Sequence, residues 1–280
     1  MTKTAALGNL GRSTFKLIHL TIIATYAKRR LMNKLRTTNN VSPYEIESKV
    51  ESFHWWFVVR RRLLKSMLSS VNIMTDCTTL EVGCGTGSNL KALASATLNV
   101  IGLDRSLFAL SFTKKKVEFP LMAGDLNELP IKTESVGLII AMDILEHLED
   151  DTNGIVECYR ALNKGGILIV TVPAFNSLWG IQDDVTGHKR RYLKKEILDK
   201  LKRGGFDILK SSYFNFFLFL PILIGRRLMH FFGLKVESEN RINFPMLNSL
   251  LKAIFSIEPH VLKYFLFPFG VSILCIAKKR

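Results

Sequence analysis

Short apolar runs alternate with helical patterns along the chain from about residue 77 onwards. The runs lie near residues 78–82, 98–103, 119–123, 136–142, 166–172, 206–212 and 269–277. Each has the length of a buried strand, and apolar residues recur at helical spacing in the gaps between them. Because strands that alternate with helices pair in parallel, with helices on both faces, the pattern predicts an α/β fold on a seven-stranded sheet.

Two apolar regions lie outside this alternation. Residues 13–36 read as a helix followed by a polar break, and a second apolar stretch precedes the last strand. The uninterrupted apolar part of each is shorter than the roughly 20 residues that a membrane span needs. We predict a basic, apolar N-terminal extension over residues 1–43 and a main domain over residues 44–280, which includes an apolar helical insertion over residues 213–262.

Residues 44–69 read as one long helix of unusual composition. Five aromatic residues, Phe53 to Phe57, precede three arginines, Arg60 to Arg62. In one interpretation, one face of the helix packs on the sheet and the arginines lie in water. In the other, the helix caps a ligand pocket, with Trp56 lining it and Arg60 reaching an anionic group. The sequence leaves both interpretations open.

The positive charge of the chain is concentrated near its start. The formal net charge is +15, and residues 1–40 contribute eight basic residues and no acid. A uniformly basic surface would indicate nucleic acid as a partner. Basic residues beside apolar ones favour an anionic membrane surface instead. We expect a cytoplasmic protein held peripherally at the inner face of the membrane, with a transit peptide and a poorly structured tail as alternatives.

The cysteines give no sign of a metal site or a disulfide framework. The four of them, Cys77, Cys84, Cys158 and Cys275, are widely scattered and form no C-x-x-C pair. This spacing argues against zinc and for a reducing compartment. No metal site is predicted.

A glycine-rich loop follows the first predicted strand, with glycines at Gly83, Gly85 and Gly87. Glycines allow a sharp turn and close approach of the backbone to a ligand, and the helix that follows points free N–H groups towards it. Asp104 closes the next apolar run, where an acid is placed to bind ribose hydroxyls. The G-x-G-x-G spacing, with the acid Glu81 before it, differs from the G-x-G-x-x-G loop that binds a dinucleotide pyrophosphate.

Further polar residues follow the later predicted strands. Asp125 and Leu126 come after the third, and Asp143 to His147 after the fourth. A tight turn over residues 163–166 leads into the fifth, and Gly187 to Tyr192 follow it. The carboxyl ends of parallel strands border one crevice, so we expect these blocks to lie around a common ligand site.

In this order the blocks resemble class I S-adenosylmethionine (SAM)-dependent methyltransferases. The Asp-Ile-Leu-Glu-His and Leu-x-Lys-Gly-Gly blocks are similar to the small-molecule branch that includes quinone-biosynthesis methyltransferases. The aromatic-arginine helix and the Gly187 to Tyr192 block resemble a bacterial subgroup of that branch. The resemblance covers about residues 53–212 and the last strand. It implies a Rossmann-like, mostly parallel sheet whose last strand is antiparallel to its neighbours.

The resemblance also implies SAM as the cofactor and a role for individual positions. The glycine loop would hold the methionine part of SAM, Asp104 the ribose, Asp125 and Leu126 the adenine, and Asp143 would face the sulfonium. The predicted cofactor-binding residues are Glu81, Gly83, Cys84, Gly85, Gly87, Asp104, Arg105, Asp125, Leu126 and Asp143.

Two histidines are candidates for a general base, which a hydroxyl or phenol acceptor would require. They are His147 and His188, each of which could instead be a hydrogen-bonded structural residue. Arg190 and Tyr192, together with Trp56 and Arg60, are the candidates for acceptor binding. For the first two, a solvated basic face is the competing interpretation.

The function implied by the resemblance is methyl transfer from SAM to a small-molecule or lipid-like acceptor at a membrane surface, by in-line attack on the sulfonium methyl group. RNA methylation is disfavoured, because no Asn/Asp-Pro-Pro-aromatic motif follows strand four and no cysteine pair suits pyrimidine C5 chemistry. The intact glycine loop and acids disfavour a non-catalytic protein of the same fold, and the loop spacing disfavours a nicotinamide enzyme. The sequence does not identify the acceptor or the methylated atom.

Overall fold

The computed structural model describes residues 42–71, 76–95, 99–233, 238–241 and 244–280. The helix predicted over residues 13–36 lies outside them, as does nearly all of the predicted extension over residues 1–43.

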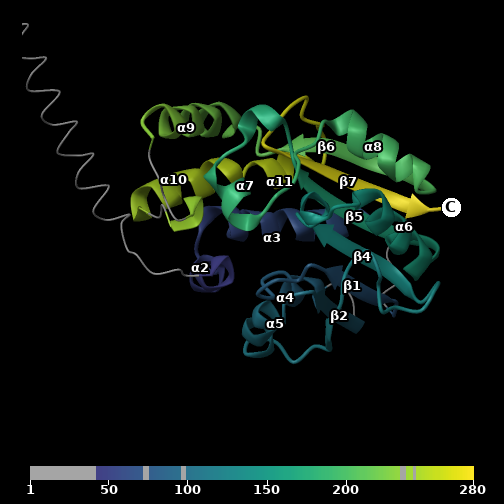
Figure 1. Ribbon diagram of the computed structural model, residues 1–280. Helices are drawn as coiled ribbons and strands as arrows, with labels where there is room; N and C mark the ends of the chain where they lie inside the picture. Colours follow the sequence, from purple (N-terminus) through teal and green to yellow (C-terminus); the bar gives the residue numbers. More distant parts are fainter. Residues whose placement is uncertain (1–41, 72–75, 96–98, 234–237, 242–243) are drawn as a thin grey trace, which may run out of the picture.

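A seven-stranded sheet forms the centre of the described fold (Figure 1). Its strands are β1 (Thr78–Val82), β2 (Asn99–Asp104), β3 (Leu121–Ala123), β4 (Val136–Met142), β5 (Leu162–Pro173), β6 (Phe206–Phe214) and β7 (Ser272–Lys279). All seven predicted strands are present, with ends that differ from the prediction by up to about four residues. The largest difference is at the start of β5, where residues 163–166 belong to the strand rather than to a separate tight turn.

The strand order is β3-β2-β1-β4-β5-β7-β6. The strands from β1 to β5 pair in parallel, and β7 pairs antiparallel with both β5 and β6. The prediction of a Rossmann-like, mostly parallel sheet with an antiparallel last strand is confirmed. The central strand β4 is buried along its whole length, which explains why its sequence is a continuous apolar run rather than an alternating one.

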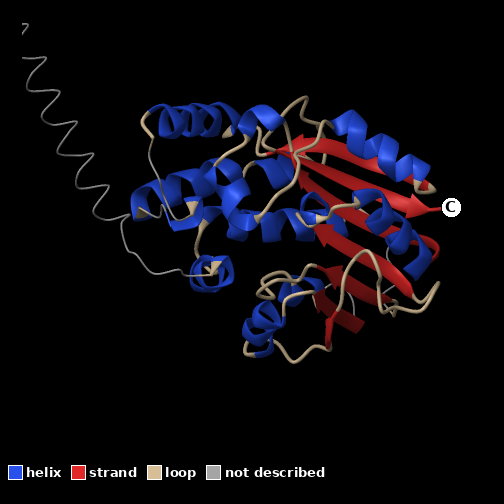
Figure 2. Ribbon diagram, in the orientation of Figure 1, coloured by secondary structure: helices blue, strands red, loops and turns tan. Residues whose placement is uncertain are grey.

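Helices flank the sheet, as Figure 2 shows. Those of the main alternation are α4 (Leu90–Leu93), α5 (Leu107–Lys114), α6 (Asp151–Ala161), α7 (Ile181–Thr186) and α8 (Lys194–Arg203), with short 3-10 turns η1 (Leu145–His147) and η2 (Asn176–Leu178). α8 packs on β6 through Ile197 and Leu201, one helical turn apart and both fully buried.

The single helix predicted over residues 44–69 is in fact two helices, α2 (Pro43–Val50) and α3 (Trp55–Leu68). The break follows from a contact with a distant segment. The side chain of Asn248 accepts a hydrogen bond from the Trp55 N–H at 2.7 Å and donates one to the Phe53 carbonyl at 3.1 Å. These backbone groups are therefore paired outside the helix, which local sequence could not indicate.

The region between β6 and β7 is helical, as predicted. It contains α9 (Phe219–Phe231), η3 (Glu239–Arg241), α10 (Pro245–Phe255) and α11 (Glu258–Val261). α10 and α11 both pack against α3. α9 differs from them because it has no buried residue. Within the described ranges, no helix combines the length and the apolar character that crossing a membrane would require.

Candidate active site

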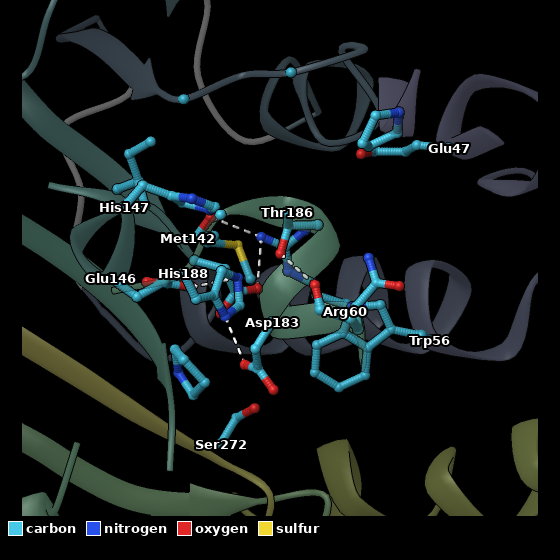
Figure 3. Close-up of a pocket in the computed structure, with 18 of the residues that line it drawn as sticks. Glu47, Trp56, Arg60, Met142, Glu146, His147, Asp183, Thr186, His188 and Ser272 are labelled. Atoms are coloured by element: carbon cyan, nitrogen blue, oxygen red, sulfur yellow. Dashed lines mark hydrogen bonds and ion pairs between the residues drawn. The ribbon is translucent and has the colours of Figure 1, made fainter. Parts of the chain in front are cut away.

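A cavity of about 650 Å³ lies at the carboxyl ends of β1, β2 and β4 (Figure 3). This volume lies in the range of small-molecule sites. The cavity is lined by Gly83 to Gly85, which follow β1, by Asp104 at the end of β2, and by Asp143, which follows β4. α2 and α3 cover it with Glu47 and Trp56. The polar residues that the sequence placed after successive strands therefore do meet in one crevice.

The three glycines of the loop all have positive φ, +69° at Gly83, +54° at Gly85 and +83° at Gly87. A Cβ at Gly83 would lie 2.7 Å from Ile144 Cδ1, and one at Gly87 would lie 2.6 Å from Thr113 Cγ2. A Cβ at Gly85 would meet only the Glu47 carboxyl, 3.8 Å away. Two of the glycines therefore allow close packing behind the loop, while the middle one leaves space on the cavity side.

Asp104 ties the glycine loop to the end of β2. Its Oδ2 accepts a hydrogen bond from the Gly85 N–H at 2.8 Å, and its Oδ1 accepts one from the Ser106 N–H at 2.8 Å. Burial raises the pKa of this carboxyl, and the two backbone hydrogen bonds oppose that rise. The carboxylate is thus held at the cavity wall.

Two further carboxyl groups lie close to the loop. Glu81 is buried beneath it, where Oε1 accepts a hydrogen bond from Asn89 at 2.8 Å and Oε2 has no partner among the described residues. Glu47 reaches the loop from α2 and accepts a hydrogen bond from the Thr86 hydroxyl at 3.2 Å. Burial raises the pKa of each carboxyl to about 7. Sequence analysis missed Glu47, because its helix joins the site only through tertiary packing.

Arg60 and Asp143, which both line the cavity, form an ion pair. The Nη2 of Arg60 lies 3.0 Å from the Asp143 Oδ2 and donates to the Met142 carbonyl at 2.8 Å. Asp143 has a positive φ of +55°, and its Oδ1 accepts a hydrogen bond from Thr171 at 3.0 Å. Of the two interpretations of the aromatic-arginine helix, this arrangement favours the cap. The partner of Arg60, however, is a carboxylate of the protein itself.

Three titratable side chains gather on one side of the cavity. We call Glu146, His147 and His188 the acceptor cluster. Each offers one ligand-type atom, and the three atoms lie within 4.8 Å of one another. The two imidazole rings are 4.7 Å apart, and His188 Nε2 lies 3.8 Å from Glu146 Oε1. Figure 3 shows the cluster on one side of the pocket and Trp56 on the other.

Burial shifts the pKa values of two members of the acceptor cluster, Glu146 and His147. It raises the pKa of Glu146 well above its ordinary value, and the charge of Asp143 adds to this rise. Burial and the neighbouring His188 lower the pKa of His147 to about 4. At neutral pH His147 is therefore uncharged and keeps one nitrogen lone pair.

Asp183, on α7, positions His188. Its Oδ1 lies 2.7 Å from His188 Nδ1, and both of its oxygens accept hydrogen bonds from the buried Arg191. Burial raises the pKa of this carboxyl, but the His188 hydrogen bond and the Arg191 charge outweigh burial and lower it to about 2. An ionised Asp183 favours the tautomer with the proton on Nδ1, which leaves the Nε2 lone pair facing Glu146. Sequence analysis missed Asp183, five residues before His188.

Most of the predicted site residues line the cavity. They are Trp56, Arg60, Gly83, Cys84, Gly85, Asp104, Arg105, Asp125, Leu126, Asp143, His147 and His188.

Four predicted site residues lie outside that lining. Glu81 is buried beneath the glycine loop, and Gly87 is the glycine of that loop that packs against Thr113. The Tyr192 hydroxyl donates to Asp151 at 2.7 Å, and the Arg190 guanidinium donates to the Leu148 and Glu149 carbonyls. The structure thus gives Arg190 and Tyr192 contacts at the start of α6 rather than in the cavity.

Comparison with known proteins gives consistent results. Residues 80–170 match the family model described as a methyltransferase domain. A probable S-adenosylmethionine-dependent methyltransferase of Mycolicibacterium smegmatis is 29% identical over 132 residues, which is 46% of this chain and 51% of the relative. The ubiquinone/menaquinone biosynthesis C-methyltransferase UbiE of Campylobacter jejuni is 25% identical over 216 residues. The alignment covers 64% of this chain and 91% of that relative. The chain spans 51%, 42% and 35% of the lengths of three curated relatives.

Solved structures agree on the fold. The phosphoethanolamine N-methyltransferase 2 of Haemonchus contortus, solved in complex with S-adenosyl-L-methionine, aligns with a TM-score of 0.51 and 19% identity. The alignment covers 78% of this chain and 52% of that one. Residues 80–170 therefore match a methyltransferase domain, and the solved structure shares the fold of this chain.

The cavity suits SAM chemically. SAM carries an ammonium group, a sulfonium and ribose hydroxyls, and the lining of the cavity presents carboxyl groups from Glu47, Asp104 and Asp143. Glu81, beneath the glycine loop and outside that lining, has one buried oxygen without a partner among the described residues. A pyrophosphate would be repelled by the same carboxylates, which disfavours a nicotinamide cofactor.

Proposed function

We propose that this protein transfers the methyl group of SAM to a hydroxyl or phenol of a small, largely apolar acceptor at a membrane surface. The observation that carries the proposal is the hydrogen bond of Asp104 to the Gly85 N–H, because it places a carboxylate and an open glycine turn at one wall of the cavity.

In this proposal one end of the cavity binds SAM and the other binds the acceptor. Asp104 binds the ribose hydroxyls, Asp125 and Leu126 hold the adenine, and the glycine loop holds the amino-acid end. Bound SAM would supply a methyl group attached to a positively charged sulfur. The sulfur keeps the electron pair of the S–CH₃ bond when the methyl group is transferred. Trp56 and the acceptor cluster hold the acceptor in line with that methyl group. Positioning of this kind lowers a barrier by about 7–11 kcal/mol at best.

In this proposal the acceptor cluster removes the proton of the acceptor hydroxyl or lowers its pKa. A hydroxyl becomes a competent nucleophile only when its proton is removed or its pKa is lowered. His147 is uncharged at neutral pH and therefore offers a lone pair inside the cavity, and Asp183 orients the ring of His188 beside it. An aromatic wall lies opposite, where Trp56 stacks with Phe214 and Phe255 at centroid distances of 6.1 and 5.8 Å. This wall favours an apolar or aromatic acceptor.

Support for the membrane surface comes from α9. Leu220, Ile224, Leu228 and Phe231 follow one another at helical spacing and are all exposed, with Phe231 at 81%. We call these four residues the apolar stripe of α9. Arg226, on the same helix, is turned inwards and pairs with Glu239 at 2.8 Å. A helix anchored by its polar side that exposes an apolar stripe suits the interface of a bilayer.

The cofactor part is tested by calorimetric titration of the full chain with SAM and, separately, with NADH. We expect SAM binding and no NADH signal. Asp104→Ala should weaken SAM binding about 100-fold, because charged hydrogen bonds contribute about 1.5–3 kcal/mol each. Asp76→Ala, at an exposed aspartate before β1, serves as the matched control. Equal SAM affinity in Asp104→Ala and the wild type would refute the ribose assignment.

The membrane part is tested by sedimentation with vesicles of phosphatidylglycerol and phosphatidylcholine. Replacing Leu220, Ile224 and Leu228 by Gln should reduce vesicle binding more than tenfold, because each loses the transfer energy of an apolar side chain. The control is Leu193→Gln with Leu209→Gln, since these leucines are similarly exposed on other elements. Unchanged vesicle binding by the α9 variant would exclude the stripe as the contact and would point to residues 1–36.

A further inference from the structure

The acceptor cluster contains a carboxyl group for which the protein offers no partner. Glu146 is fully buried, and neither of its side-chain oxygens has a hydrogen-bond partner among the described residues. A buried polar atom left unpaired destabilises the folded protein, and Glu146 has two such atoms. Native proteins rarely keep such a group unless something outside the protein satisfies it.

The neighbours of Glu146 are a ring nitrogen of His147 and a ring nitrogen of His188. His188 Nε2 is 3.8 Å from Glu146 Oε1, too far for a hydrogen bond but close to the spacing of two ligands on one ion. Ligand atoms at about 2.1 Å from a tetrahedral metal lie about 3.4 Å apart. The full cluster spans 4.8 Å, so side-chain shifts of about 1 Å would bring its three atoms to that spacing.

The ring of each histidine also makes a hydrogen bond outside the cluster, as the rings of metal-binding histidines do. His188 Nδ1 lies 2.7 Å from Asp183 Oδ1, and the ring of His147 is hydrogen-bonded to the backbone of Gly187. Such second contacts fix the tautomer and aim the remaining nitrogen. Backbone pairing keeps the two segments together, since the Lys189 N–H donates to the Glu146 carbonyl at 2.8 Å.

We propose that Glu146, His147 and His188 bind a divalent transition-metal ion such as Zn²⁺, with Asp183 as the positioning residue for His188. Two imidazoles and one carboxylate leave a coordination position open, as in catalytic zinc and other divalent-metal sites. The cluster lines the cavity, so that position can take an oxygen atom of the acceptor and lower the pKa of its hydroxyl.

This inference rests on the proposed function, because it states how the cluster prepares the acceptor. It departs from the sequence prediction of no metal site, which considered cysteine spacing alone. His188 lies 41 residues beyond His147 in the chain, and only the fold brings the two together.

The test is a titration of the chelator-treated full chain with ZnCl₂, with MnCl₂ and with MgCl₂, followed by calorimetry and by elemental analysis after gel filtration. We expect one equivalent of Zn²⁺ to be retained. Mg²⁺ should bind more weakly, because it prefers oxygen ligands. Glu146→Gln and His188→Ala should each lose the retained equivalent, and Asp183→Asn should lower the affinity about 10–100-fold.

His260→Ala is the control, because His260 is an exposed histidine on α11 outside the cavity. It should retain the full equivalent. SAM titration of the same samples shows whether the variants are folded and tests the proposed function separately from the metal. No stoichiometric Zn²⁺ in the wild type, or an equivalent that Glu146→Gln and His188→Ala both retain, would overturn the metal site even when SAM binding is intact.

Discussion

At the end of the cavity that we propose to hold the cofactor, short loops place the functional groups through their own backbone conformation. At the proposed acceptor end, side chains from distant segments place the functional groups. The glycine loop and Asp104 lie within about 20 residues of each other, and a backbone hydrogen bond joins them. His188 depends instead on its contact with the buried Asp183, which also pairs with Arg191 and with Arg226 of α9. The cofactor end therefore depends on local geometry, and the acceptor end on the packing of the whole domain.

This difference explains what the sequence could reveal. Positive φ at Gly83, Gly85 and Gly87 strongly favours glycine, so the loop is visible as a motif. Strand β4 is visible as a continuous apolar run. Asp183, by contrast, is one aspartate among many, and nothing local shows that it becomes buried against His188 and Arg191. The break between α2 and α3 was equally hidden, because it depends on Asn248, almost 200 residues away.

The largest effect is expected at the acceptor end, from Asp183→Ala. It would leave the buried guanidinium of Arg191 without its carboxylate, and loss of one partner of a buried pair costs about 3–5 kcal/mol. The free energy of unfolding, from urea titration, should fall by that amount. Asp184→Ala, at the exposed neighbour, should change it by less than about 1 kcal/mol. Equal effects of the two variants would show that the acceptor end does not depend on this network.

Gly83→Ala probes the cofactor end, with a smaller expected effect. The positive φ alone costs a non-glycine residue about 1–3 kcal/mol, and the added Cβ also meets Ile144. Thermal unfolding and SAM titration should both show a loss. Gly225→Ala is the matched control, since nothing lies within 4 Å of its Cβ position and alanine favours a helix. A fully stable Gly83→Ala protein would contradict the backbone argument for this end.

Glu258 tests whether the helices between β6 and β7 are bound to the sheet by a buried carboxyl group. It is fully buried and accepts hydrogen bonds from the Asn215 and Phe217 N–H groups at 2.6 and 3.1 Å. Burial raises its pKa from 4.5 to about 7. The folded state then keeps a proton that the unfolded state releases between these pH values, so this group's contribution to stability falls as pH rises from about 4.5 to 7.

In Glu258→Gln no proton can be lost, so the free energy of unfolding should fall less over this pH range, by up to about 3 kcal/mol. Urea titrations at pH 4.5, 6 and 7.5 measure the difference. Glu118→Gln, at an exposed glutamate, should keep the wild-type slope. A wild-type slope in Glu258→Gln would mean that Glu258 is not protonated in the folded protein.

The smallest effect is expected for Arg190→Ala. Asp151 keeps its bonds to Tyr192 and Lys200 at 2.7 Å each, so the variant should lose less than about 1 kcal/mol of stability. SAM affinity should not change, because Arg190 is outside the cavity lining. A large loss of methyl acceptance in a stable Arg190→Ala protein would instead support the acceptor-binding role that the sequence suggested.

The position of β7 has a consequence for how the protein is made. β6 pairs only with β7 within the described sheet, and β7 also covers the edge of β5. Until β7 has been synthesised, the nascent chain has an open strand edge at β5 and apolar helices without a finished sheet beside them. At about 5–20 residues per second, the interval from residue 214 to residue 279 lasts roughly 3–13 s. We expect aggregation during synthesis to be greatest in that interval.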